Sequence, residues 1–356
     1  MVTYYVVYIF IFASYAFIGR VKGDKQKKNR AKEILLFGTV FILLALRHPR
    51  MGTDLGYGNA IGYLHSFQVL SRYSLKEIIL LNGYLNYEPG YLVLNKLISL
   101  VSTQDTALLL VCALIPLALI GYYYYKKSDD LLFSFVIFLG LPSFLILFSG
   151  LRQGIALGIC TIALGLIDEK KPVKFIVTVV IASLFHSSAI FVLLSYPVAR
   201  IRMIRRNRWI SLGLLVIVFM FRSPIFSTLA RILRPTALLT NSGAITLLIV
   251  FVVIYIFCFL LGRDDEENNS LLNIFYLACI CQCFAGIYAT ALRVGYYFMI
   301  CLPILLPRVI NQQTDVKTYK ISKATVFLVF VVYGLYSIAT TSWAMANPYH
   351  FFWELR

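Results

Sequence analysis

The sequence is poor in charged side chains, and acidic residues are the scarcer kind. Charged residues make up 14% of the 356 residues and hydrophobic residues 60%, with a mean hydropathy of +0.80. A soluble globular domain carries about one quarter charged residues. The net charge of +17 would suit a nucleic-acid-binding protein only if a water-exposed face carried it, and this composition provides no such face. We therefore predict a polytopic integral membrane protein and no nucleic-acid partner.

Several catalytic motifs are also missing. The sequence contains no GxSxG, HExxH or P-loop and no DxD-like metal pair, which removes support for ATP-driven and metal-clamped chemistry. Cys279, Cys281 and Cys283 are closely spaced, but no His or carboxylate lies beside them in the chain. We interpret the seven cysteines as small apolar membrane residues, and we expect no disulfide, no metal and no cofactor.

The position of the first basic residues predicts the topology. No Lys or Arg precedes the apolar run at 2–19, whereas a basic segment follows at 20–33. A secretory signal peptide begins with a basic region, so we expect no cleavage. Because Lys and Arg collect in cytoplasmic loops, we predict that 20–33 is a cytoplasmic loop and that the N-terminus lies outside.

Further apolar runs are long enough for helices in a membrane. They lie at 34–46, 105–125, 131–148, 151–167, 174–199, 209–221, 244–262, 271–289, 294–309 and 324–342. The run 174–199 is interrupted by His-Ser-Ser at 186–188, and we interpret it as two short or broken helices that meet outside. We expect a single all-α domain over 1–356, with roughly 10–14 transmembrane or re-entrant helices. Segment 47–104 would be an outer-face loop with peripheral or re-entrant helices around 59–82 and 88–103.

The predicted outer side carries the side chains that are suited to catalysis or ligand binding. About two thirds of the Lys and Arg residues fall in predicted cytoplasmic loops, whereas the basic residues outside are mostly arginines. Arginine is the residue that forks around phosphate or carboxylate oxygens. The segment RHPRMGTDLGY brings Arg47, Arg50, Asp54 and Tyr57 together just after a predicted span. Its alternative interpretation is a charged interfacial turn with Arg47 on lipid headgroups.

Three further segments hold candidate residues. Glu88 in NYEPGYLVLNKL precedes a helix-like run, so it is either catalytic or a plain N-terminal cap. Arg152 and Gln153 begin the run LRQGIALG, where the arginine either binds an anion or snorkels. His186 in SLFHSSAIF is a catalytic candidate or a hydrogen-bonded core residue. Arg293 in TALRVGYYFM repeats the pattern of an arginine that enters an aromatic-rich span.

These segments, in this order, resemble a known family. RHPRMGTDLGY, YEPGY, LRQGIALG, FHSSAI and RVGYYF look like the EpsG family, which comprises Wzy-type polymerases of bacterial O-antigen and exopolysaccharide. The resemblance spans roughly residues 40–350. It implies a GT-C-like, metal-independent glycosyltransferase that joins oligosaccharide repeat units carried on undecaprenyl pyrophosphate, at the outer face of the bacterial inner membrane.

The resemblance also implies roles for the candidate residues. The family's arginines correspond to Arg47, Arg50, Arg152 and Arg293, which would bind pyrophosphate and substrate together with Gln153 and Tyr57. Its acidic residues correspond to Asp54 and Glu88, and its histidine to His186; which of these three is the catalytic base stays open. The implied partners are the lipid-linked oligosaccharide and membrane lipids, with a chain-length regulator as a further candidate.

Two other functions fit the composition. An O-antigen-ligase-like transferase would share the lipid pyrophosphate donor, but it would normally carry its dominant outer loop late in the chain. A flippase or transporter of the same glycolipid should show internal repeats and charges at mid-membrane. The sequence shows no convincing repeat, and its ionisable groups cluster towards one face, which favours an enzyme.

Overall fold

The computed structural model is a bundle of helices. It describes the chain except for residues 23, 57–61, 79, 81–86, 234–244 and 355–356. Within the described residues the only strand-like feature is one isolated β-bridge between Arg47 and Phe351. The helices are α1 (Val2–Arg20), α2 (Lys25–Ala45), η1 (Thr53–Leu55), α3 (Tyr63–Ser71), α5 (Pro89–Ser99), α6 (Asp105–Lys127), α7 (Leu131–Gly140), α8 (Pro142–Ser149), α9 (Leu151–Asp168), α10 (Pro172–Ser183), η2 (Ser187–Leu194), α11 (Ser195–Ala199), α12 (Arg205–Met220), α13 (Arg222–Leu233), α14 (Ile245–Leu261), α15 (Glu266–Ala285), α16 (Ala289–Met299), α17 (Leu302–Asn311), α18 (Val316–Thr340) and η3 (Ser342–Ala344).

The bundle has the helices of a polytopic membrane protein. Among the described residues, α1, α6, α9 and α18 are each long and apolar enough to cross a membrane. Three bent pairs would raise the number of spans to seven if each pair is one span. The predicted fold class, an all-α polytopic membrane protein, is confirmed.

Two apolar runs that the sequence predicts as single helices are bent. The run 131–148 is divided into α7 and α8 at an angle of 66°, and 294–309 falls on α16 and α17, which meet at 44°. Pro142 begins α8, and Pro303 lies in the first turn of α17. Proline lacks the N–H that would continue the preceding helix, so each helix restarts in a new direction.

The basic segment at 20–33 is only partly a loop, contrary to its prediction. α2 begins at Lys25, where the Asp24 carboxylate accepts a hydrogen bond from the Lys27 N–H at 2.8 Å. Such a side-chain cap stabilises the first turn, and the charged residues that follow are therefore helical. The interruption predicted within 174–199 is confirmed, because α10 ends at Ser183 and η2 begins only after His186.

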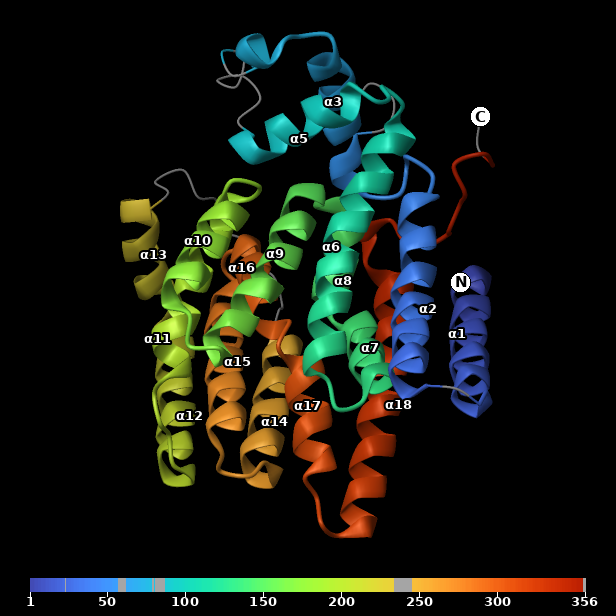
Figure 1. Ribbon diagram of the computed structural model, residues 1–356. Coiled ribbons are helices and arrows are strands. Elements are labelled where there is room, and N and C mark those ends of the chain that lie inside the picture. The colour runs from blue at the N-terminus through green and yellow to red at the C-terminus, as the bar shows by residue number, and fades with distance from the viewer. Residues whose placement is uncertain (23, 57–61, 79, 81–86, 234–244, 355–356) are drawn as a thin grey trace.

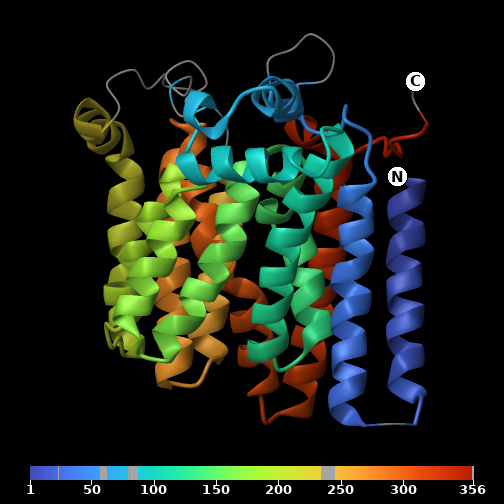
Figure 2. The ribbon, with the colours of Figure 1, turned by 45° about the horizontal axis from the view of Figure 1, so that its top comes forward.

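The connections segregate to two ends of the bundle (Figure 1). The end drawn at the bottom, here the lower pole, holds the end of α1, the start of α2 and the connections at 169–171, 200–204, 262–265 and 312–315. The opposite end, the upper pole, holds α3, α5 and the C-terminal segment after α18. Figure 2 shows α5 lying across the upper ends of the bundle helices. This arrangement places the start of α9 and the break after α10 close to the start of α5.

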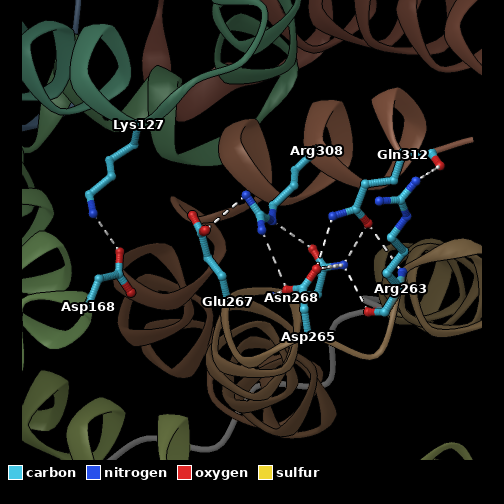
Figure 3. Close-up of polar contacts among 8 residues, drawn as sticks. All are labelled: Lys127, Asp168, Arg263, Asp265, Glu267, Asn268, Arg308 and Gln312. Atoms are coloured by element: carbon cyan, nitrogen blue, oxygen red, sulfur yellow. Dashed lines mark hydrogen bonds and ion pairs between the residues drawn. The ribbon is translucent and has the colours of Figure 1, made fainter.

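A polar network ties helices together at the lower pole (Figure 3). Arg308 of α17 contacts Glu267 of α15 at 2.8 Å and donates to Asn268 at 3.0 Å. Lys127 of α6 pairs with Asp168 of α9 at 2.8 Å. These bonds fix the lower ends of four helices.

The C-terminal segment closes the upper pole. The Phe352 N–H donates to the Leu46 carbonyl at 3.0 Å, and the His48 N–H donates to the His350 carbonyl at 2.8 Å. The Tyr4 hydroxyl donates to the Ala346 carbonyl at 2.5 Å. We call residues 346–352 the C-terminal clasp, because they join α1 to the chain that leaves α2.

Candidate active site

The segment after α2 is seated on the corner between α8 and α9. Gly52 has φ of +121°, and a β-carbon there would lie 2.1 Å from the Phe148 carbonyl oxygen. Only glycine combines this backbone conformation with so close an approach. The Ser149 hydroxyl then accepts from the Asp54 N–H at 3.1 Å. The corner thus fixes the position of the Asp54 carboxylate.

Glu88 is the centre of the site, because it contacts two other helices. One carboxylate oxygen accepts from the Arg152 Nη1 at 2.5 Å. The other accepts from the Ser187 N–H at 2.8 Å and lies 3.4 Å from the His186 Nδ1. Glu88 is the N-cap residue of α5, but its side chain does not cap that helix. The carboxylate instead joins α5 to the start of α9 and to the start of η2.

A close backbone contact holds this arrangement in place. The Gly90 N–H donates to the Leu184 carbonyl at 2.8 Å, and a β-carbon on Gly90 would approach that oxygen to 2.7 Å. Leu184 is the C-cap residue of α10 and lies two residues before His186. The small residue after Pro89 therefore lets α5 approach α10 closely enough for Glu88 to reach the histidine.

Aromatic rings surround the Arg152 guanidinium. The carbon at its centre lies 4.6 Å from the Tyr87 ring centroid and 5.6 Å from that of Tyr63. Its Nε also donates to the Tyr63 hydroxyl at 3.1 Å. Burial is the main reason that the pKa of Tyr63 rises to about 12, so this hydroxyl stays neutral. Ring faces favour a cation and limit its access to water.

A second pair of opposite charges lies next to the first. Arg293 of α16 approaches Asp54, with 4.0 Å between Nη2 and Oδ2. Gln153, the residue after Arg152, donates to the Arg293 carbonyl at 2.6 Å. The contacts therefore form one continuous series from Asp54 through Arg293, Gln153 and α9 to Glu88 and His186.

The carboxyl group of Glu88 is ionised at neutral pH. Burial alone would raise its pKa, but the His186 ring, the Ser187 N–H and the positive charge of Arg152 outweigh burial. The resulting pKa is about 2, compared with the ordinary value of 4.5. In this arrangement Glu88 is a weak base and a strong electrostatic partner for cations.

The sequence profile of the EpsG family matches residues 30–351. The chain belongs to the EpsG family. Membership identifies it as a membrane protein of the polysaccharide-polymerase type, with glycosyltransferase-like activity in general. No curated protein sequence and no solved structure matches the chain.

The structure brings together six of the nine residues that the sequence predicts for this EpsG-family site. The residues joined by direct contacts are Asp54, Glu88, Arg152, Gln153, His186 and Arg293. The plain-cap interpretation of Glu88 is wrong, because its side chain makes no capping bond to α5. Its catalytic role stays a prediction.

The other three predicted residues are placed differently. Arg47 is 0% exposed, and its guanidinium donates to the Leu44 carbonyl near the end of α2 and to those of Leu147 and Phe148 at 3.4 and 3.3 Å. It therefore packs α2 against α8, and neither lipid headgroups nor a ligand reaches it in this conformation. Arg50 is exposed on the same segment. Tyr57 lies outside the described residues.

Three contributors to the site escape sequence analysis. Tyr63, Tyr87 and Ser149 contact Arg152 or the Asp54 backbone, yet each is an ordinary residue in an apolar chain. For Tyr87 the sequence does offer one signal, because this residue directly precedes the predicted Glu88 in NYEPGY. Among the described residues, no group of three or more His, Cys, Asp and Glu side chains is close enough to hold a metal ion.

Proposed function

We propose that this protein polymerises oligosaccharide repeat units carried on undecaprenyl pyrophosphate, at the outer face of a bacterial inner membrane. The observation that carries the proposal is the contact between Arg152, Glu88 and His186 at the upper pole. An arginine for a diphosphate and a histidine for a hydroxyl proton are the two functions that this transfer needs. The upper pole, which holds the N-terminus, would face outward, because most lysines lie in the connections of the lower pole and in the helix ends beside them.

The leaving group sets the first requirement. When the bond between the anomeric carbon and the diphosphate breaks, undecaprenyl pyrophosphate departs with the electron pair and gains negative charge. The bonds to Tyr63 and Glu88 use two of the five N–H donors of Arg152, which leaves it able to bind a second anion. Arg293 is 41% exposed and is placed to share this charge. Guanidiniums supply such stabilisation without a metal ion.

The acceptor sugar sets the second requirement. Its hydroxyl oxygen attacks the anomeric carbon of the growing chain, and its proton must go to a base. The low pKa of Glu88 makes its carboxylate a poor base. The Nδ1 edge of the His186 ring faces this carboxylate. We assign Nε2 of His186 as the base and Glu88 as the group that orients the ring and stabilises the imidazolium. Asp54, paired with Arg293, is the alternative base.

Reconstitution tests the proposal directly. The purified protein is incubated with a lipid-linked repeat unit, and the products are separated on a gel. A ladder of products is expected from a polymerase. A transporter would give no ladder, and a ligase-like transferase would need a different acceptor; either result would overturn the assignment.

The variant Arg152→Lys tests the site within this assay. Lysine keeps the charge but cannot bond Glu88, Tyr63 and a diphosphate at once, so the ladder should form about 100-fold more slowly or not at all. Arg72→Lys is the matched control, because Arg72 is exposed at the same pole beyond the end of α3. A normal ladder from Arg152→Lys would remove the arginine from the mechanism.

A further inference from the structure

A pocket lies at the lower pole, at the opposite end of the bundle from the candidate active site. It lies between the start of α12, the end of α14 and the start of α15. Its charged lining consists of Arg205, Arg208 and Arg263 with one opposing carboxylate, Asp264. The pocket is therefore electropositive, and the proposed polymerase reaction makes no use of it.

Arg208 in this pocket is a buried cation. The residue is 3% exposed. Its guanidinium donates to the Asn269 and Asn273 side-chain oxygens, each at 2.5 Å, and to the Tyr255 hydroxyl at 3.3 Å. All three acceptors are neutral.

Among the described residues, no carboxylate lies within ion-pair distance of Arg208 to balance its charge. Arg308 at the same pole differs, because it pairs with Asp265 and Glu267. Burying a charge is costly unless a counter-charge lies nearby. The neutral acceptors orient the guanidinium, but they leave its charge for an anion that enters the pocket.

The walls of the pocket have the chemistry of a membrane boundary. Cys258, Phe259, Leu272 and Leu305 contribute apolar lining. Trp209 packs edge-on against Phe259, with ring centroids 5.0 Å apart, and is 53% exposed. Tryptophan gathers where a membrane meets water.

Beyond the pocket, α12 and α14 each expose an apolar surface. Ile210 and Leu214 of α12 are 59% and 52% exposed, and Ile249 and Val253 of α14 are each 58% exposed. Both helices meet at the pocket, through Arg205 and Arg208 on one side and Phe259 on the other. A ligand with a phosphate at one end and hydrocarbon chains at the other would match both the arginines and this surface.

We propose that the pocket binds an anionic glycerophospholipid from the leaflet at the lower pole. The phosphate lies among Arg205, Arg208 and Arg263, and the acyl chains lie along the exposed faces of α12 and α14. Basic pockets at the ends of membrane helices suit such headgroups. Asn268 and Arg263 belong to the network around Arg308 (Figure 3), so one wall of the pocket is fixed before the lipid binds.

Native mass spectrometry of the purified, delipidated protein tests the proposal. Dioleoylphosphatidylglycerol and dioleoylphosphatidylcholine are titrated separately, with glycerol 3-phosphate and inorganic phosphate as soluble arms. Tight binding of the phosphatidylglycerol alone is expected. Equal binding of phosphatidylcholine would overturn the need for a net anion, and equal binding of glycerol 3-phosphate would overturn the lipid as the ligand.

A double substitution locates the binding. Arg205→Gln with Arg263→Gln leaves the internal bonds of Arg208 intact, and we expect it to weaken phosphatidylglycerol binding about tenfold or more. Arg202→Gln with Arg206→Gln removes the same charge from exposed positions outside the pocket, and binding should change less than about twofold. Equal weakening in both variants would mean general charge attraction at this pole and would overturn the pocket.

Discussion

Glu88 is the residue on which the other groups of the site depend. It joins a cation at the start of α9 to a backbone N–H and an imidazole at the start of η2. Each contact favours the charged carboxylate, which is why its pKa lies near 2 although it is partly buried. The carboxylate therefore stabilises the folded protein as well as positioning Arg152 and His186.

The contribution of Glu88 to stability should depend on pH in a defined way. A pKa below the ordinary 4.5 means that the contribution is complete above 4.5 and declines as the pH falls towards 2. Glu88→Gln should therefore unfold at a lower temperature than the wild type by a constant margin from about pH 8 to about pH 6. The margin, on the order of 3 kcal/mol, should shrink below the ordinary pKa of a glutamate. Thermal unfolding in detergent measures it, and a margin that already shrinks above pH 6 would point to another titrating group.

His186 should be required for the chemical step if it is the base. His186→Ala should slow ladder formation by about 100-fold or more, and added imidazole should restore part of the rate. His65→Ala is the control, because His65 is exposed on α3 at the same pole and contacts none of the site residues described above. A His186→Ala protein with the normal rate would transfer the role of base to Asp54.

Arg47 shows a limit to assigning the role of a residue from sequence. Its position next to Pro49, Gly52 and Asp54 in a charged outer segment predicts an anion site. Two of its hydrogen-bond acceptors, however, are the carbonyls of Leu147 and Phe148, about one hundred residues away along the chain. No local pattern reveals such partners, because backbone carbonyls are present at every position. Glu88, Arg152 and His186 are predictable because ionisable groups are rare in an apolar chain.

At the scale of elements, breaks in helices build the site. The end of α8 at Ser149, the gap between α10 and η2, and the start of α5 each contribute a residue or a backbone group. His-Ser-Ser at 186–188 predicts the second of these breaks. The bends at Pro142 and Pro303 carry a signal of the same kind, but length and hydropathy alone give continuous spans there.

Substitutions at two glycines test whether the corner between α8 and α9 holds the segment after α2 in place. Gly52→Ala places a β-carbon against the Phe148 carbonyl oxygen at a positive φ, so it should destabilise the protein by about 1–3 kcal/mol and displace Asp54. Gly38→Ala in α2 meets nothing within 4 Å and should stabilise its helix by about 0.5–1 kcal/mol. Thermal unfolding and ladder formation compare the two variants. Equal behaviour would mean that the corner between α8 and α9 does not hold this segment.

At the scale of the molecule, the two poles make the topology testable. Val101 is 91% exposed at the upper pole, and Lys170 is exposed at the lower pole. The seven native cysteines are buried or partly buried, so an introduced thiol should dominate labelling. Val101→Cys should react with a membrane-impermeant maleimide in intact cells, and Lys170→Cys only after permeabilisation. The reverse pattern would place the candidate active site in the cytoplasm.

The C-terminal clasp has a consequence for how the protein is made. Leu46 and His48 leave the ribosome long before their partners, Phe352 and His350, have been synthesised. A nascent chain can insert its early helices into the membrane while the segment from Arg47 to Asp54 still lacks part of its support. Assembly of the upper pole therefore waits until the C-terminal clasp has been synthesised. A chain cut short before residue 346 would keep its membrane helices but lack the clasp that supports the segment beside the candidate active site.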